Sequence, residues 1–270
     1  MRTILTSALI LIGIAAAMYL ALCAFLYLQQ DRMLFYPRAN DRSLLERWKP
    51  HRVAIPSGEH VLEGFWTENG VNESARVIIY FGGNAEDVLY TASTSFQLDA
   101  RRMLVVNYRG YGGSPGQPNQ AGLYEDALAI YDYIVANGTD SRDIVVMGRS
   151  LGSGLATMLA AEREVQRAIL ITPYDSLAEV AARHYPIFPV RLLLKHPFDS
   201  AAFAKRAKAP ALLLAAEGDT IIPPHHAQRL HDLWRGPSQL HILNGVGHND
   251  IERHPEYYAL INAFLAEGDQ

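Results

Sequence analysis

The sequence predicts an α/β protein with a doubly wound, mostly parallel sheet and a small cap insertion, preceded by one N-terminal transmembrane helix. Beyond residue 50, short runs of Val, Ile and Leu alternate with segments of helical length, which is the pattern of α/β proteins. The apolar runs lack an in–out alternation, as is typical of parallel strands buried on both faces. The first 30 residues are almost uncharged and strongly apolar, which predicts the membrane helix.

The apolar N-terminal stretch favours a retained membrane anchor. From residue 3 to residue 30 no side chain is charged. A helix needs about 20 apolar residues to cross a bilayer, whereas the apolar region of a cleaved signal peptide has only about 7–15. We therefore expect an anchor over residues 1–30 with residues 4–28 in contact with membrane lipid. A cleaved signal peptide is the alternative.

The orientation of this single span stays open. Basic residues are more numerous after the span than before it, which favours a domain on the cytoplasmic side. The residues concerned are Arg32, Arg38, Arg42, Arg47 and Lys49 after the span and Arg2 before it. Because the later group belongs to the folded domain as well, the sequence does not fix the side of the membrane.

The composition limits the classes of function. The formal net charge is −4 without a long run of Lys or Arg, so the chain lacks the electrostatic basis for binding nucleic acid. The single cysteine, Cys23, lies in the apolar stretch, which leaves no disulfide framework and no cysteine-based metal site. The remaining length suits one α/β domain, which we place at residues 31–270. The oligomeric state stays open.

The elements of this domain follow one another in a regular order. Residues 51–68 predict two strands joined by a turn at Ser57–Gly58. Further strands are expected at 75–81, 102–108, 143–148, 167–173, 211–218 and 238–245. Helices are expected at 120–137, 151–162, 226–234 and 255–267, from apolar residues at helical spacing. The interval 175–209 is longer than one helix needs, and we interpret it as a cap over the carboxyl ends of the strands.

A Gly-x-Ser-x-Gly pattern marks the junction between the strand at 143–148 and the helix that follows. It reads Gly148-Arg149-Ser150-Leu151-Gly152. At such a junction the serine sits on a sharp turn with its hydroxyl raised above the sheet, while glycines allow close backbone approach. The alternative is an ordinary tight turn. We interpret Ser150 as a nucleophile.

A serine nucleophile needs a base and an acid that orients the base. In this architecture the acid and then the histidine follow the serine, each in a loop after a strand. Asp219 follows the strand at 211–218, and His248 follows the strand at 238–245. The sequence therefore predicts a Ser150–Asp219–His248 triad.

Other residues compete for these roles. Asp175 and Glu217 are alternative acids, although Glu217 is too near its strand to reach the histidine easily. His225 and His226 begin a helix, where we expect them to cap it or to face solvent. No set of spaced carboxylates or cysteines accompanies them, so we expect no metal site there.

Two backbone N–H groups are candidates for an oxyanion hole. Leu151 N–H lies at the start of the helix after Ser150, and Asn84 N–H lies in the loop Gly82-Gly83-Asn84 after an earlier strand. The glycine-rich stretch 107–118 is not a dinucleotide site, because Pro115 replaces the third glycine and no helix begins at once. Arg109 is expected to fix that turn by hydrogen bonds.

With these residues identified, the sequence resembles the α/β-hydrolase superfamily. It is most similar to N-terminally membrane-anchored α/β-hydrolase-domain proteins, a group described as peptidase-like or as lipid and thioester hydrolases. The matching stretches are "DRMLFYP", "YFGGNAEDV", "NYRGYGGSPGQPNQAGLYEDA", "GRSLGSGLA", "GDTIIPPHHAQRL" and "GVGHND".

The resemblance implies roles for five residues. It implies Ser150 as nucleophile, Asp219 as acid and His248 as base, with Asn84 and Leu151 N–H groups as oxyanion hole. The family's usual H-G-N-A-G reads G-G-N-A-E at residues 82–86. The missing histidine leaves the backbone donor in place but can change how the loop is held.

These features predict a serine hydrolase that cleaves an ester or thioester through an acyl-enzyme, without a cofactor. The cap is apolar and aromatic with interleaved basic residues, so it either packs on the core or forms a lipid-facing entrance for acyl chains. Two alternatives remain. A serine aminopeptidase would need an acidic residue for the substrate amine, for which Glu86, Asp87 and Asp175 are candidates. A non-catalytic membrane scaffold could share the fold. The physiological substrate and its acyl-chain length stay open.

Overall fold

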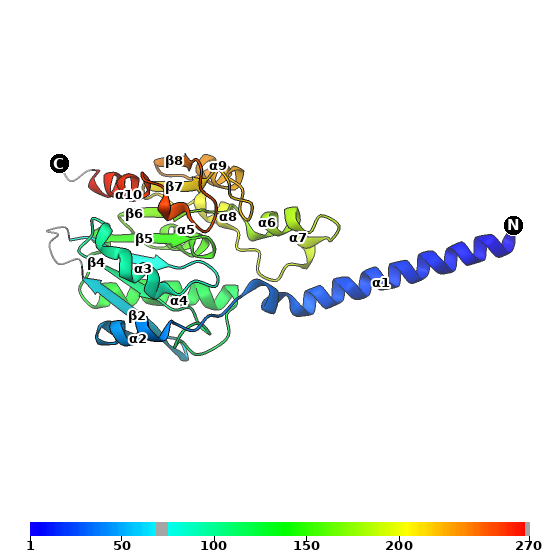
Figure 1. The fold of residues 1–270 in the computed structure, drawn as a ribbon, viewed down its shortest axis with the longest axis horizontal. Coiled ribbons are helices and arrows are strands. Elements are labelled where there is room, and N and C mark those ends of the chain that lie inside the picture. The colour runs from blue at the N-terminus through cyan, green and yellow to red at the C-terminus, as the bar shows by residue number, and fades with distance from the viewer. Residues whose placement is uncertain (69–74, 268–270) are drawn as a thin grey trace.

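One eight-stranded sheet organises the part of the chain that the computed structural model describes, residues 1–68 and 75–267 (Figure 1). The strands are β1 (Arg52–Ser57), β2 (His60–Glu68), β3 (Val77–Phe81), β4 (Arg102–Val106), β5 (Ile144–Arg149), β6 (Arg167–Ile171), β7 (Ala211–Ala216) and β8 (Ser238–Leu243). Every strand expected from the sequence is present.

The sheet is mostly parallel, as predicted. Its strand order is β1-β2-β4-β3-β5-β6-β7-β8. β2 pairs antiparallel with β1 and with β4, and all the remaining pairs are parallel. The carboxyl ends of β3 and of β5 to β8 therefore meet at one edge, where ligands bind in sheets of this kind.

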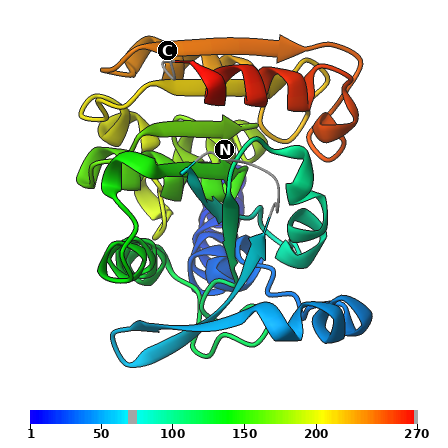
Figure 2. The ribbon, with the colours of Figure 1, turned by 90° about the vertical axis from the view of Figure 1, so that its left-hand side faces the viewer.

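Helices cover both faces of the sheet, which confirms the doubly wound fold (Figure 2). One face packs against α4 (Gln120–Ala136), α5 (Leu151–Glu162), α8 (Ser200–Ala204) and α9 (His225–Leu233). The other packs against α3 (Val88–Thr94) and α10 (Tyr257–Ala266). The strands between them, such as β3, β6 and β7, are buried along their whole length.

Two short helices were not predicted from the sequence. α2 (Arg42–Trp48) and α3 have 7 residues each, too few for a helical period to emerge. Each begins at an aspartate whose carboxylate accepts backbone N–H groups, Asp41 for α2 and Asp87 for α3. Single 3₁₀ turns are η1 (Lys49–His51), η2 (Ser95–Gln97), η3 (Ser141–Asp143) and η4 (Ile251–Arg253).

The N-terminal helix α1 (Arg2–Leu34) projects away from the sheet (Figure 1). Among the described residues it is the one helix long and apolar enough to cross a membrane. It has 33 residues and runs past residue 30, where we expected the anchor to end. Directly after it, Phe35 is buried in the core, so the helix enters the domain without a flexible linker.

The segment between β6 and β7 forms a projection beside α1. It contains α6 (Leu177–His184) and α7 (Val190–Leu193), and a bridge between Ser176 and Asp199 closes its base. We call residues 176–199 the α6–α7 hairpin. α8, which also falls in the expected cap interval, instead packs against α5 on the sheet.

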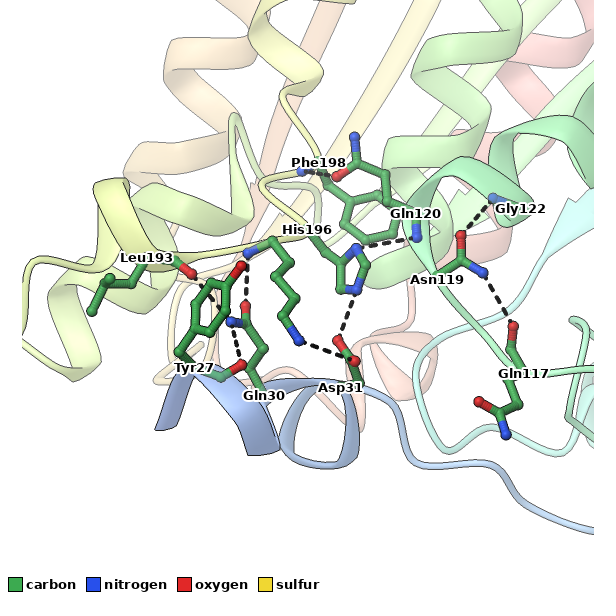
Figure 3. A network of polar contacts seen from close by, with 11 residues as sticks. Tyr27, Gln30, Asp31, Gln117, Asn119, Gln120, Gly122, Leu193, His196 and Phe198 are labelled. Carbon is green, nitrogen blue, oxygen red and sulfur yellow. Dashed lines mark hydrogen bonds and ion pairs between the residues drawn. The ribbon is translucent and has the colours of Figure 1, made fainter. Parts of the chain in front are cut away.

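Polar contacts join the end of α1 to this hairpin (Figure 3). Gln30 donates to the Leu193 carbonyl at 3.1 Å and accepts from Lys195 N at 2.7 Å. Asp31 contacts His196 at 2.9 Å and Lys195 at 3.4 Å. Nearer the N-terminus of α1, the Tyr19 hydroxyl donates to the Ile187 carbonyl at 2.8 Å.

Candidate active site

Ser150 occupies a strained turn between β5 and α5. Its backbone φ is +51°, a left-handed value that costs a non-glycine residue energy and is common at functional sites. A Cβ at position 148 would lie 2.2 Å from the Gly152 carbonyl oxygen, and one at position 152 would lie 2.0 Å from that of Phe81. The two glycines are therefore steric requirements of this turn.

The structure brings Ser150, His248 and Asp219 together. His248 Nε2 lies 2.9 Å from Ser150 Oγ, and His248 Nδ1 lies 2.6 Å from Asp219 Oδ2. The other oxygen of Asp219 accepts the N–H groups of Ile221 and Ile222 at 2.9 and 2.7 Å. These bonds fix the carboxylate, which in turn holds the imidazole against the serine.

Ser150 and His248 line a cavity of about 720 Å³, and Asp219 contacts His248 without lining that cavity. Asp219 and His248 are only 4% and 9% exposed, whereas Ser150 is half-buried. Asn84 and Leu151, the residues expected to stabilise an oxyanion, line the same cavity. Their role as donors stays a prediction.

Comparisons with known proteins agree with this fold. Residues 77–193 match a family model described as "alpha/beta hydrolase fold". The chain is 32% identical over 252 residues to an uncharacterized protein of Mycobacterium tuberculosis, covering 91% of this chain and 89% of that protein. The chain belongs to the α/β-hydrolase superfamily.

Relatives of this hydrolase include a lipase and an esterase. The lysophosphatidylserine lipase ABHD12 of Xenopus tropicalis is 30% identical over 240 residues, which are 76% of this chain and 61% of that protein. Among solved structures, the Pyrococcus furiosus esterase Pf2001 has a TM-score of 0.67 and 19% identity, covering 86% of this chain and 98% of that one. This last likeness shows the fold alone.

Glu86 holds the loop that carries Asn84 in this hydrolase. One carboxylate oxygen accepts Gly83 N–H at 2.7 Å, and the other accepts the hydroxyls of Tyr80 and Thr91 at 2.9 and 2.7 Å. Burial raises the pKa of Tyr80 well above its usual value, so the phenol donates as a neutral group. Glu86 thus fixes a loop that lacks the family's usual histidine.

The Asn84 side chain connects the same loop to the end of α1. Its amide donates to the Leu34 carbonyl, and its oxygen accepts from Tyr36 N at 3.0 Å and from the Tyr111 hydroxyl at 2.7 Å. The amide side chain is therefore engaged in positioning the loop. Its backbone N–H remains the atom proposed as donor.

Arg149 joins the two loops on either side of Ser150, a function that sequence reasoning missed. Its guanidinium lies 3.3 Å from the Glu86 carboxylate and donates to the His248 carbonyl at 3.1 Å. Burial alone would lower the pKa of Arg149, but Glu86 together with smaller contributions from other acidic groups, including Glu252, outweighs it and the pKa is raised. The arginine stays charged. The position of Arg149 within the Gly-x-Ser-x-Gly pattern, next to Ser150, was the feature of the sequence that could have indicated this role.

The competing residues lie elsewhere. Asp175 pairs with His226 at 2.6 Å and with Arg229 at 3.1 Å, away from His248, and Glu217 is exposed. The expectation that His226 caps the helix or faces solvent is wrong, because its ring is 1% exposed and turned inward to Asp175. Arg109 fixes its turn as expected, through two 2.7 Å bonds to Asp126.

No metal centre is evident in the described residues. Within 1–68 and 75–267, no group of three or more His, Cys, Asp or Glu side chains is arranged to hold a metal ion.

Proposed function

We propose that this protein is a serine hydrolase that cleaves an ester or thioester of a lipid-like substrate at the membrane. The observation that carries the proposal is the hydrogen-bonded chain from Ser150 through His248 to Asp219, which opens on a cavity of about 720 Å³. Membership of the α/β-hydrolase superfamily and the lipase and esterase relatives support it.

The geometry supports the following reaction. Ser150 Oγ attacks the carbonyl carbon while His248 Nε2 takes its proton, and Asp219 stabilises the imidazolium. The N–H groups of Asn84 and Leu151 bind the oxyanion. When the tetrahedral intermediate collapses, the bond to the alcohol or thiol breaks and His248 returns the proton to that leaving group. Water, deprotonated by His248, then cleaves the acyl-serine ester and releases the acid.

An apolar cavity beside α1 supports an acyl substrate. It has a volume of about 150 Å³ and is lined by the end of α1 and by the α6–α7 hairpin, including Tyr27, Ala181, Tyr185 and Leu193. Leu34 lines both this cavity and the catalytic one. An acyl chain leaving the bilayer along α1 therefore meets apolar side chains up to Ser150.

The contacts of the three candidate acids argue against an aminopeptidase. Such an enzyme needs a free carboxylate for the substrate amine. Glu86 is held by four groups, including Arg149 and Gly83 N–H. Asp87 accepts from Asn40 and from the N–H groups of residues 41 and 89. Asp175 is paired with His226 and Arg229.

The Ser150→Ala variant tests the proposal directly. Loss of a triad nucleophile lowers kcat on the order of 10⁶-fold, so we expect no measurable hydrolysis of p-nitrophenyl esters and no labelling by a fluorophosphonate probe. Ser141→Ala, in the 3₁₀ turn before β5, serves as the control and should retain both. Hydrolysis by Ser150→Ala at the wild-type rate would refute the role of Ser150 as nucleophile. A wild-type protein that is inactive and not labelled by the probe would favour a non-catalytic membrane scaffold.

A further inference from the structure

A third cavity lies on the side of the α6–α7 hairpin that faces α9. Its volume is about 460 Å³, and no triad residue lines it. Five basic side chains line it beside apolar ones, with Glu179 as the acidic residue among them. The basic residues are Arg183, Arg191, His225, His226 and Arg229.

The ion pairs around this cavity leave one positive charge uncompensated. Arg191 forms a two-pronged pair with Glu179 at 2.6 and 2.8 Å, and Arg229 pairs with Asp175 at 3.1 Å. Arg183 is exposed and has no carboxylate partner within the described part of the chain. Three arginines thus face two carboxylates, and Arg183 supplies the excess charge.

The two histidines add an unsatisfied polar group. His226 Nδ1 is bound to Asp175, while its Nε2 is buried without a hydrogen-bond partner in the described residues. The ring of His225 lies 4.2 Å from that of His226. Burial, the adjacent His226 and the guanidinium groups of Arg229 and Arg183 lower the pKa of His225. An anion in the cavity would relieve this repulsion.

The cavity also receives the N-terminus of α9. This 9-residue helix begins at His225, after Pro224, and has no side chain capping its first N–H groups. The N–H of His226 donates to the Pro223 carbonyl at 3.0 Å, so the helix dipole and the remaining N–H groups make this end favourable for phosphate and other anions. The N-terminus of α9 and the charge of Arg183 therefore both favour the binding of an anion.

Contacts with α1 place this cavity near the membrane surface. Phe188 lines both the basic cavity and the apolar one, and its ring stacks on Tyr19 at a centroid distance of 6.0 Å. The part of α1 before this contact, residues 2–18, is about 25 Å long. That length is close to the bilayer's hydrocarbon thickness of about 30 Å. We infer that the hydrocarbon ends near Tyr19, short of the residue 28 expected from the sequence, which puts the basic cavity at the level of lipid headgroups.

We propose that this cavity binds a phosphate group, supplied by an anionic phospholipid of the surrounding membrane. Arg183 and the start of α9 provide the attraction, and the α6–α7 hairpin separates the bound phosphate from the apolar cavity beside α1. The site does not depend on the hydrolytic activity, since it shares no residue with the triad.

Native mass spectrometry of the full chain in dodecylmaltoside tests the site. We expect the wild type to retain phosphatidylglycerol, and Arg183→Gln/His225→Gln to weaken retention at least tenfold. Neither replaced side chain forms an ion pair within the described part of the chain, so the unfolding midpoint without lipid should not change. Arg47→Gln, an exposed residue on α2, is the matched control and should retain lipid as the wild type does.

Competition with inorganic phosphate distinguishes a lipid headgroup from a soluble phosphate ester as the source of the bound anion. If millimolar phosphate competes with phosphatidylglycerol in the wild type, the headgroup phosphate is the bound group, as proposed. Binding of phosphate without any retention of lipid would assign the site to a soluble phosphate ester and overturn the lipid source. Equal lipid retention by wild type and double variant, or binding of neither probe, would overturn the site itself.

Discussion

Arg149 donates a hydrogen bond to the main-chain oxygen of His248, 3.1 Å away. The residue immediately before the proposed nucleophile therefore holds the loop that carries the proposed base. The same guanidinium is paired with Glu86, which fixes Gly83 N–H. One side chain thus connects the serine turn, the histidine loop and the loop expected to form the oxyanion hole.

Replacing Arg149 with Met should misplace His248 without removing it. A displacement of about 1 Å can cost about 10²-fold in rate, so we expect kcat to fall by about that factor with KM little changed. Arg149→Lys should recover part of the loss, since it restores a charge for Glu86. Steady-state kinetics and the rate of fluorophosphonate labelling report the effect. A wild-type labelling rate in Arg149→Met would show that the contact does not position the histidine.

Gly152→Ala should destabilise the protein severely. Its Cβ would meet the carbonyl oxygens of Phe81 and Gly82 at 2.0 and 2.6 Å, and backbone atoms cannot rotate away as a side chain does. We expect a loss beyond the about 1–3 kcal/mol of ordinary overpacking, measured as a lower unfolding midpoint. Gly13→Ala is the control, because nothing lies within 4 Å of its Cβ. An unchanged midpoint for Gly152→Ala would contradict the described turn.

Filling the apolar cavity beside α1 should shorten the acyl chains that the enzyme accepts. Ala181 lines this cavity, while its neighbour Ala182 lines the basic one on the other side of α6. We expect Ala181→Trp to lower kcat/KM for long-chain p-nitrophenyl esters at least tenfold and to spare the acetate. Ala182→Trp should show no such dependence on chain length. If both variants treat long and short esters alike, the cavity does not bind the acyl chain.

The Asp175–His226 pair should make stability depend on pH. Burial alone would raise the pKa of Asp175, but hydrogen bonding and charge from His226, together with Arg229, hold it below its ordinary value of 3.8. A carboxylate with a lowered pKa stabilises the fold above its unfolded pKa and loses that contribution as pH falls through the folded pKa.

We therefore expect Asp175→Asn to be less stable than the wild type at pH 7, by about 1.5–3 kcal/mol for bonds to a charged group. The difference should shrink as the pH falls from 7 through the folded pKa of Asp175, which lies below 3.8, because the wild-type carboxyl is protonated there. A series of unfolding midpoints from pH 7 downward measures it, with exposed Asp232→Asn on α9 as control. A difference that does not change with pH would show that the charge of Asp175 is not what stabilises the fold.

The sequence predicted the fold and pointed to three residues that the structure brings into contact, because both inferences depend on order along the chain. Buried strands are recognisable by composition, and Asp219 and His248 each follow one of them. The contacts of Glu86 with Arg149 were not predictable in this way, since they join residues 63 positions apart. The sequence shows that both residues are charged but not that they are in contact.

The inward turn of His226 was missed for a related reason. From sequence, a histidine at the start of a helix is expected to face water. Its burial depends on Asp175, 51 residues earlier and on another element. Residues 175–209 were likewise interpreted as a single cap. In the structure, α8 packs against α5 and only the α6–α7 hairpin projects. Which part of an insertion packs on the sheet depends on tertiary contacts.

The direct passage from α1 into the core limits where this enzyme can act. Phe35 is buried immediately after the helix ends, and Tyr36 N is bound to Asn84. If α1 spans the membrane as proposed, the absence of a flexible tether fixes the height and tilt of Ser150 relative to the lipid surface. Under the proposed function, such an enzyme would not reach across to another bilayer. We then expect it to work on molecules that arrive by lateral diffusion in its own leaflet, with a rate that follows their surface density rather than their bulk concentration.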